Sequence, residues 1–178
     1  MLTLWGEVLR AVPDSRLLVQ AAALDDLPNR ARFGELCAKH GIAPARLILR
    51  GFSPIDQAPA SYADIDIALD PFPFCGGMTS LEALWLGVPV ITLAGETIAS
   101  RQSASMLMNL GLPELIAEDA AQYLHKAAQL AHELPRLAGL RCGLRQRFAG
   151  SPLMDYAGFA HALEAAYRDM WLSWIASN

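Results

Sequence analysis

Residues 64–95 constrain the fold of this chain most, because they place a glycine pair between two apolar segments. Apolar residues alternate with polar or small ones over residues 65–69, which is the period of two typical of a strand. Pro71 and Pro73 exclude regular structure after that strand, and glycines at 76–77 give the backbone freedom that a side chain would deny. We therefore expect a strand followed by a tight turn.

The second part of this stretch predicts a short helix and another strand. Thr79 and Ser80 are favoured at the start of a helix, and Gly87 is favoured just after its end. The apolar face of this helix would consist of Leu81, Leu84 and Trp85. Residues 88–93 are almost wholly apolar, as expected of a buried parallel strand.

The rest of the chain repeats this alternation of strands and helices. Helices are expected over residues 2–12, 29–40, 97–110, 118–134, 135–148 and about 155–176. Short strands are expected over 17–21 and 47–49, with a further apolar segment at 115–117 and a loop at 51–59. Such alternation indicates an α/β fold, a Rossmann-like parallel sheet with helices on both faces. Ligands of these folds bind at the carboxyl ends of the strands.

Composition favours one sizeable domain over residues 1–178. The net charge is −4, and no basic run or patch suggests binding to nucleic acid. Three widely spaced cysteines favour free thiols in a reducing compartment, and no signal peptide is apparent. The longest apolar run, residues 83–95, is too short to span a bilayer. We expect a soluble cytoplasmic domain that does not bind a membrane.

The glycine turn and the helix after it could bind an anionic ligand. Backbone amides at the start of a helix and the helix dipole favour a phosphate there. Glu82, on the flank of the apolar face, could accept hydrogen bonds from the hydroxyls of a ribose. Alternatively, Gly76 and Gly77 only form a tight turn and Glu82 is a solvated helix residue, because a glycine pair alone is a weak motif.

Residues 69–95 resemble the nucleotide-binding lobe of the O-linked N-acetylglucosamine transferase family, through the run LDPFPFCGGMTSLEALWLGVPVITLAG. Bacterial members carry Leu-Asp, Pro-Tyr-Asn-Gly-Gly, several threonines, Glu-Ala-Leu-Trp and Gly-Val-Pro in this order. The resemblance extends to LWGEVLRAVPDSRLL (4–18), ETIASRQSASMLMNLGLPELIA (96–117), RFAGSPLMD (147–155) and YRDMWLSW (167–174). It thus covers nearly the whole chain.

The resemblance implies the C-terminal lobe of an inverting glycosyltransferase with two Rossmann-like lobes, the GT-B architecture. The family's TPR-containing members transfer a sugar, with UDP-N-acetylglucosamine as the expected donor, to a protein acceptor. The resemblance implies no metal and no cofactor besides the donor, and it leaves the catalytic residues unknown. The resemblance implies Gly76, Gly77, Thr79 and Ser80 at the diphosphate and Glu82 at the ribose. Three further substrate-binding candidates come from position alone: Met78 within the same turn, Asp70 at the carboxyl end of the preceding strand, and Arg101 near the start of the helix after the next strand.

Several positions depart from the family's pattern. Met78 stands where threonine is usual, and Cys75 where asparagine is usual. Residues 53–63 lack the family's histidine, and its diphosphate-binding lysine would precede Met1. The first, central strand of a doubly wound lobe is also missing from the chain. We therefore expect part of a longer enzyme, inactive without its N-terminal lobe. Alternatively, a second chain could fill the gap, or the strands at Leu17 and Ile65 could close it.

Two other functions fit the sequence less well. The departures also fit a degenerate lobe that serves protein–protein contact. A dinucleotide oxidoreductase is disfavoured, because the glycines at 76–77 do not follow the G-x-G-x-x-G spacing.

The remaining candidate residues have ordinary structural explanations. Asp64 and Asp66 match an Asp-x-Asp metal motif but begin a strand rather than follow one, so a role at the strand edge is favoured. Asp70 could cap the turn, and Arg101 could form an ordinary ion pair. The four histidines lack metal spacing.

The other cysteines and the last helix complete the expectations. Cys37 and Cys142 are expected in the core, and Cys75 could be exposed. Trp171 and Trp174 are expected to pack, and the last helix to present an apolar patch toward another lobe.

Overall fold

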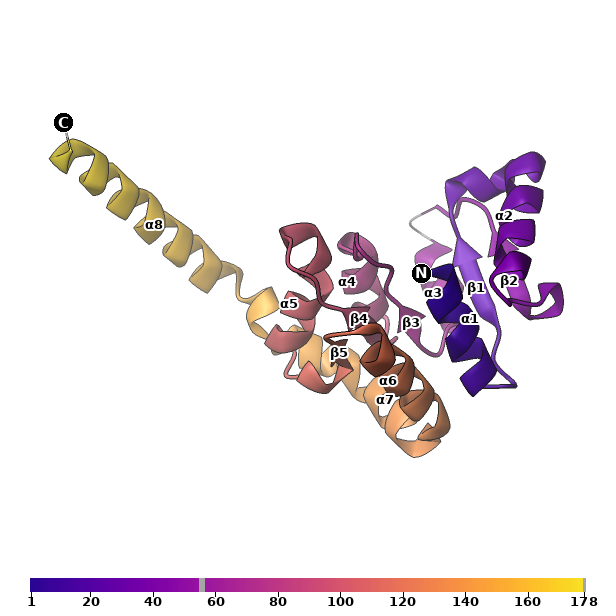
Figure 1. The fold of residues 1–178 in the computed structure, drawn as a ribbon. Coiled ribbons are helices and arrows are strands. Elements are labelled where there is room, and N and C mark those ends of the chain that lie inside the picture. Colours follow the sequence, from indigo (N-terminus) through magenta and orange to yellow (C-terminus); the bar gives the residue numbers. More distant parts are fainter. Residues whose placement is uncertain (55–56, 178) are drawn as a thin grey trace.

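The computed structural model describes residues 1–54 and 57–177, and it confirms the expected α/β fold (Figure 1). The helices are α1 (Leu2–Ala11), α2 (Leu27–Lys39), α3 (Ala58–Ala63), α4 (Met78–Trp85), α5 (Gln102–Asn109), α6 (Ala120–His132), α7 (Leu134–Ala149) and α8 (Tyr156–Ala176). The strands are β1 (Leu17–Gln20), β2 (Leu47–Arg50), β3 (Ala68–Leu69), β4 (Val90–Leu93) and β5 (Ile116–Ala117).

The strands of the described residues form two parallel sheets. β1 pairs with β2, and β4 lies between β3 and β5. Figure 1 shows β1 and β2 beyond β3, on the side away from β4. Leu69 of β3 packs against the same apolar cluster as Leu17 of β1, so the two sheets are neighbours although no ladder joins them among the described residues.

Two elements differ from the sequence-based predictions near the glycine turn. The expected strand at 65–69 is shorter, since only Ala68 and Leu69 pair with β4. The backbone oxygens of Ile65 and Asp66 accept hydrogen bonds from the Arg141 guanidinium and are not in the ladder. The expected loop at 51–59 instead includes the start of α3. Pro59 lies in the first turn of α3, where a proline does not interrupt helical hydrogen bonds. Residues 55–56 of that loop lie outside the described residues.

The expected helix over 97–110 is divided into two pieces. A 3-10 turn, Ile98–Ser100, precedes α5. Thr97 and Ser100 form a reciprocal capping box in which the Ser100 hydroxyl accepts from the Thr97 amide. The cap fixes the segment that follows β4 close to the glycine turn, where the Cys75 amide donates to the Ala99 carbonyl.

The main core surrounds β4. Val90, Ile91 and Thr92 are all at most 1% exposed, as expected for the middle strand of a covered sheet. Helices α1, α4, α5, α6 and α7 contribute the surrounding apolar side chains. A smaller cluster joins α1, β1 and α2 around Cys37, which is buried as expected.

The other two cysteines correct the sequence-based expectations. Cys142 is exposed rather than in the core, and Cys75 is buried rather than exposed. The Cys75 thiol donates a hydrogen bond to the backbone oxygen of Ala99 at 3.0 Å. The Cys75 side chain therefore faces the protein interior and connects the glycine turn to Ala99.

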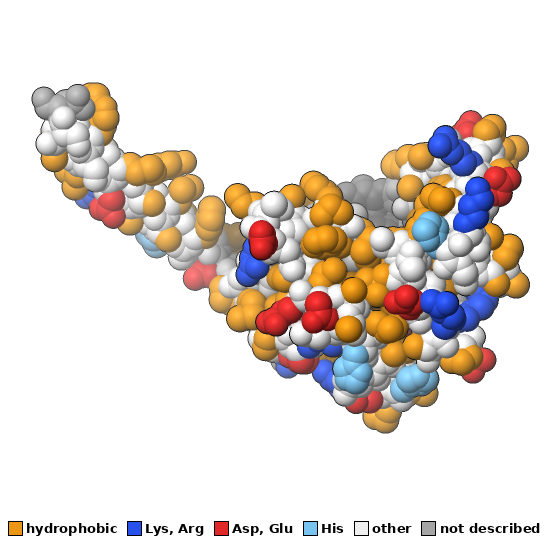
Figure 2. All heavy atoms as spheres, viewed as in Figure 1, with side chains coloured by type: hydrophobic (Ala, Val, Ile, Leu, Met, Phe, Trp, Pro, Cys, Tyr) orange, Lys and Arg blue, Asp and Glu red, His pale blue; other side chains and the backbone are white. Residues whose placement is uncertain are grey.

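Helix α8 leaves the rest of the molecule as a single long helix (Figure 1). None of its residues is buried, and hydrophobic side chains lie along its surface (Figure 2). Phe159 is 69% exposed, and the rings of Trp171 and Trp174 stack on each other 5.4 Å apart. The expected apolar patch is thus present, whereas the two tryptophans pack on each other and not into the core. Within the part of the chain that the structure describes, no helix has both the length and the hydropathy to cross a bilayer.

We predict that Gly87→Ala destabilises the fold by at least about 1–2 kcal/mol, because L-residues with a side chain disfavour the left-handed region. Gly87 ends α4 at a φ of +82°, and a Cβ there would lie 2.7 Å from the backbone oxygen of Arg141. Urea unfolding followed by circular dichroism measures the effect.

The matched control is Gly139→Ala on α7. No atom lies within 4 Å of a Cβ added at Gly139, so this change should stabilise by about 0.5–1 kcal/mol through helix propensity. Equal stability of the two variants would contradict the assignment of strain to Gly87.

Candidate functional site

The turn between β3 and α4 is organised by the carboxylate of Asp70. This side chain is 4% exposed, and its Oδ1 accepts from the Gly76 amide at 2.7 Å. Its Oδ2 accepts from the Thr92 hydroxyl of β4 at 2.6 Å. The backbone oxygen of Asp70 accepts from the Tyr123 hydroxyl of α6 at 2.9 Å. Asp70 therefore joins the turn to its neighbouring elements, and a contact with substrate stays a prediction.

Ser80 belongs to the same internal network. Its hydroxyl lies 3.4 Å from Asp70 Oδ1 and 2.9 Å from the Ser103 hydroxyl, which also lies 2.9 Å from the Gly76 carbonyl. Ser80 is 5% exposed and Ser103 is fully buried. The Ser80 hydroxyl therefore has partners inside the protein, and its direct contact with a diphosphate stays a prediction.

Close packing restricts the turn more strongly at Gly76 than at Gly77. A Cβ at Gly76 would lie 2.3 Å from Ser80 Oγ, and a Cβ at Gly77 would lie 3.0 Å from Gln102 Oε1. Real Cβ atoms do not approach another heavy atom to 2.3 Å, so Gly76 cannot be replaced without movement. The turn can thus lie directly against α5 and the start of α4.

The start of α4 offers free backbone donors. Gly77 is the N-cap and supplies no side-chain acceptor. Among the described residues, the amides of Met78 and Thr79 find no acceptor, whereas that of Ser80 bonds to the Gly77 carbonyl. The side chains of Met78 and Thr79 are both exposed beside these amides. This is the arrangement that favours an anion.

Arg101 lies next to this turn but supports the backbone. Its Nη1 donates to the carbonyl of Gly95, which follows β4, at 2.9 Å. The side chain of Arg101 is exposed, so a further contact with phosphate or acceptor is sterically open. The sequence-based alternative, an ordinary ion pair, is not found for Arg101 among the described residues.

A cavity of about 490 Å³ lies beside α4, at the carboxyl ends of β1 and β2. Its walls come from the segments that follow these two strands, from the region of α3, and from Thr79 and Glu82 of α4. The volume falls within the range of small-molecule sites. Two predicted site residues thus share one cavity, and the free amides of α4 lie in the same turn as Thr79.

Tyr62 connects two walls of this cavity, and the sequence alone gave no sign of it. Its hydroxyl donates to the carbonyl of Thr79 at 3.0 Å and lies 3.4 Å from Glu82 Oε2. Burial, and then the nearby Glu82 carboxylate, raise the pKa of Tyr62 to about 12. The hydroxyl therefore remains a proton donor at neutral pH.

The loop after β2 is fixed by Asp25. Its Oδ2 accepts from the Phe52 amide at 3.0 Å, and a Cβ at Gly51 would lie only 1.6 Å from Oδ1. The Phe52 side chain stays 69% exposed and lines the cavity. The sequence did not predict this wall of the cavity, because Asp25 and Phe52 are 27 residues apart in sequence.

The Asp-x-Asp pair has ordinary partners. Asp64 forms an ion pair with Arg50 at 2.6 Å, and Asp66 lies exposed in a bend. Across residues 1–54 and 57–177, no group of three or more His, Cys, Asp or Glu side chains is placed to hold a metal ion. Because β3 begins at Ala68, Asp64 and Asp66 both precede that strand, and neither lies at its edge as expected.

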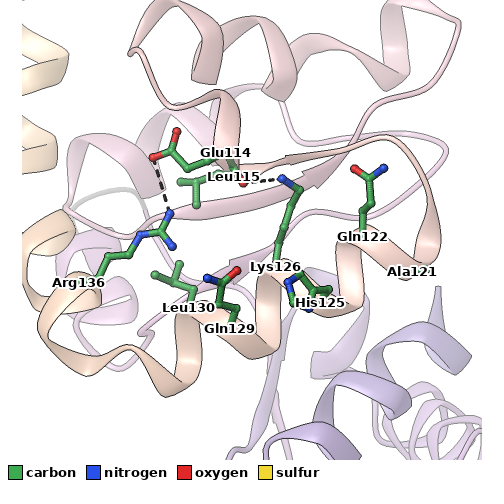
Figure 3. Close-up of a pocket in the computed structure, with 9 residues that line it drawn as sticks. All are labelled: Glu114, Leu115, Ala121, Gln122, His125, Lys126, Gln129, Leu130 and Arg136. Atoms are coloured by element: carbon green, nitrogen blue, oxygen red, sulfur yellow. Dashed lines mark hydrogen bonds and ion pairs between the residues drawn. The ribbon is translucent and has the colours of Figure 1, made fainter.

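A second cavity, of about 620 Å³, lies between the segment before β5 and helices α6 and α7 (Figure 3). Its cations are already paired. Lys126 Nζ donates to the carbonyl of Glu114 at 2.8 Å, and Arg136 forms ion pairs with Glu114 and Glu133. This cavity is lined by none of the predicted site residues, whereas Thr79 and Glu82 line the cavity beside α4.

Comparison with a family model gives a match to residues 1–163, described as glycosyl transferase family 41. A relative from Petunia hybrida, titled probable UDP-N-acetylglucosamine–peptide N-acetylglucosaminyltransferase SPINDLY, is 37% identical over 96% of the chain and 18% of its own length. The Arabidopsis thaliana SPINDLY is 36% identical, with 19% of its length covered. The chain therefore spans less than a fifth of these relatives.

A solved structure gives the same result for the fold. A mutant of the Thermobaculum terrenum O-GlcNAc transferase matches 96% of the chain with a TM-score of 0.90 and 40% sequence identity. The match covers 33% of that protein's chain. The expected resemblance and the expected fold are both confirmed.

We predict that Asp70→Ala lowers the free energy of unfolding by at least about 1–3 kcal/mol, because it leaves the Gly76 amide and the Thr92 hydroxyl without an acceptor. Chemical unfolding measures this effect. The control is Asp66→Ala, which removes an exposed carboxylate and should change stability by less than about 0.5 kcal/mol. If both variants lose the same stability, Asp70 does not organise the turn.

Proposed function

The chain belongs to glycosyl transferase family 41, and we propose that it is the donor-binding part of a longer inverting protein glycosyltransferase. UDP-N-acetylglucosamine is the proposed donor and a protein side chain the proposed acceptor, in keeping with the names of the SPINDLY relatives. One observation carries the proposal. Thr79 and Glu82 of one short helix line a cavity at the carboxyl ends of two parallel strands.

The diphosphate would lie at the start of α4. The free amides of Met78 and Thr79 and the positive end of the helix dipole would stabilise its charge. In an inverting displacement the acceptor oxygen attacks the anomeric carbon while the diphosphate leaves, so negative charge grows on the leaving group. Fixed amides directed at that charge would act on the transition state without a metal ion. The catalytic base is not assigned.

The ribose would lie against Glu82. The carboxylate is partly exposed, lines the cavity, and stands one turn into the helix that begins at the diphosphate. This order along the helix matches the order of the two groups in a nucleoside diphosphate. Phe52, exposed on the opposite loop, would supply apolar surface for the base.

Completion of the site is proposed to require further protein. The doubly wound order expects a strand between β1 and β3, and among the described residues β1 pairs only with β2 and β3 only with β4. A segment outside these 178 residues, or a second chain, would pair with both edges. The exposed apolar surface of α8 supports contact with an N-terminal lobe. A cytoplasmic location is also proposed, and three free cysteines are in keeping with a reducing compartment.

The alternative function is a degenerate lobe that serves protein–protein contact. The observation in its favour is Met78, which is 69% exposed at the proposed diphosphate position and offers no polar group there. Nucleotide binding distinguishes the two proposals.

We predict that calorimetric titration detects binding of UDP and UDP-N-acetylglucosamine, with weaker binding of GDP and NAD. Glu82→Ala should reduce UDP affinity about 10- to 100-fold, because a hydrogen bond to a charged group contributes about 1.5–3 kcal/mol. Glu164→Gln, at an exposed position on α8, is the control and should bind as the wild type does. Absence of heat with any uridine nucleotide at millimolar concentration would exclude the donor-binding proposal.

We also predict that these 178 residues alone transfer no sugar to a protein. A radiolabelled UDP-N-acetylglucosamine assay with peptide and protein acceptors measures transfer, and the longer protein is expected to be active. Transfer by the 178-residue chain would contradict the need for another lobe.

A further inference from the structure

Tyr62 is placed to control the orientation of Glu82. It projects from α3 to α4, where its hydroxyl lies 3.0 Å from the Thr79 carbonyl and 3.4 Å from Glu82 Oε2. All three residues line the same cavity. One hydroxyl therefore touches both the backbone and the carboxylate of the helix that forms the proposed site.

This contact restricts one oxygen of the carboxylate and leaves the other open. Among the described residues, Glu82 Oε1 has no hydrogen-bond partner, whereas Oε2 lies next to the Tyr62 hydroxyl. A glutamate side chain free in solution samples many rotamers. Contact with the Tyr62 hydroxyl reduces that freedom at Oε2, and both side chains line the cavity.

We propose that Tyr62 is a positioning residue that makes the site selective for ribonucleotides over 2′-deoxyribonucleotides. The inference rests on the proposed function, because it assumes that Glu82 binds the ribose. A carboxylate held in one orientation accepts from both ribose hydroxyls. When the 2′-hydroxyl is missing, the fixed carboxylate keeps an unpaired, partly desolvated oxygen, which is costly.

A purely structural role for Tyr62 would give a different result. The bond to the Thr79 carbonyl ties α3 to α4, and its loss would loosen the wall for every ligand alike. A positioning role instead changes the ratio of two affinities. The ratio for UDP and 2′-deoxy-UDP is therefore the informative quantity.

The test is calorimetric titration of Tyr62→Phe with UDP and with 2′-deoxy-UDP. The wild type should prefer UDP by about tenfold or more, the effect of one lost hydrogen bond at a charged group. Tyr62→Phe should weaken UDP binding about five- to tenfold and 2′-deoxy-UDP binding less than about twofold. In a Glu82→Ala background, the same change should have little further effect.

Tyr167→Phe is the matched control, because it removes a hydroxyl from an exposed tyrosine on α8. It should leave both affinities unchanged. Thermal unfolding checks that Tyr62→Phe is folded. If it is not, Glu82→Gln tests the same contact from the other side, since it weakens the bond to Tyr62, and should also reduce the ratio.

Each other result has a distinct meaning. If the wild type binds no uridine nucleotide, the proposed function fails. If the wild type binds UDP and 2′-deoxy-UDP equally, or if Tyr62→Phe weakens both to the same extent, the donor-binding function stands and the role of Tyr62 is overturned.

Discussion

The buried carboxylate of Asp70 is the interaction on which the rest of this site depends. It connects the turn after β3 to Thr92 of β4, while its backbone oxygen connects the turn to Tyr123 of α6. A buried carboxylate is stable only when donors surround it, and here the Gly76 amide is one of them. The requirement to satisfy this charge thus sets the turn from which α4 begins and so the direction of its free amides.

The sequence predicted the features that depend on local pattern. The alternation of apolar segments indicated the parallel α/β fold, and the glycine pair indicated a close turn before a helix. The sequence also placed Glu82 on that helix, and the structure puts it in the cavity. Each of these predictions depends only on residues close together in the sequence, because backbone preferences and the spacing of apolar side chains are local properties.

What the sequence could not predict depends on distant partners. The Ser80 hydroxyl was expected to face a ligand, yet Ser103, 23 residues away, lies against it in the interior. The contacts of Tyr62 could not be predicted, because they form only when α3 packs beside α4. The backbone oxygen of Ile65, in the expected strand at 65–69, instead accepts from Arg141, 76 residues away. Hydrogen bonds of this range follow from the tertiary fold and leave no periodic mark on the sequence.

The two departures from the family's pattern at the turn have different consequences. Cys75 is 1% exposed and donates to the Ala99 carbonyl, so its side chain faces away from any ligand and subtracts no polar group from the site. Met78 is 69% exposed at the start of α4, so here a hydroxyl donor is lost where a phosphate would lie. The proposed anion site would then depend on backbone amides and on the Thr79 hydroxyl. Since backbone amides are unaffected by side-chain replacement, α4 would still bind a diphosphate, with lower affinity. Further donors would have to come from the proposed segment that completes the sheet between β1 and β3.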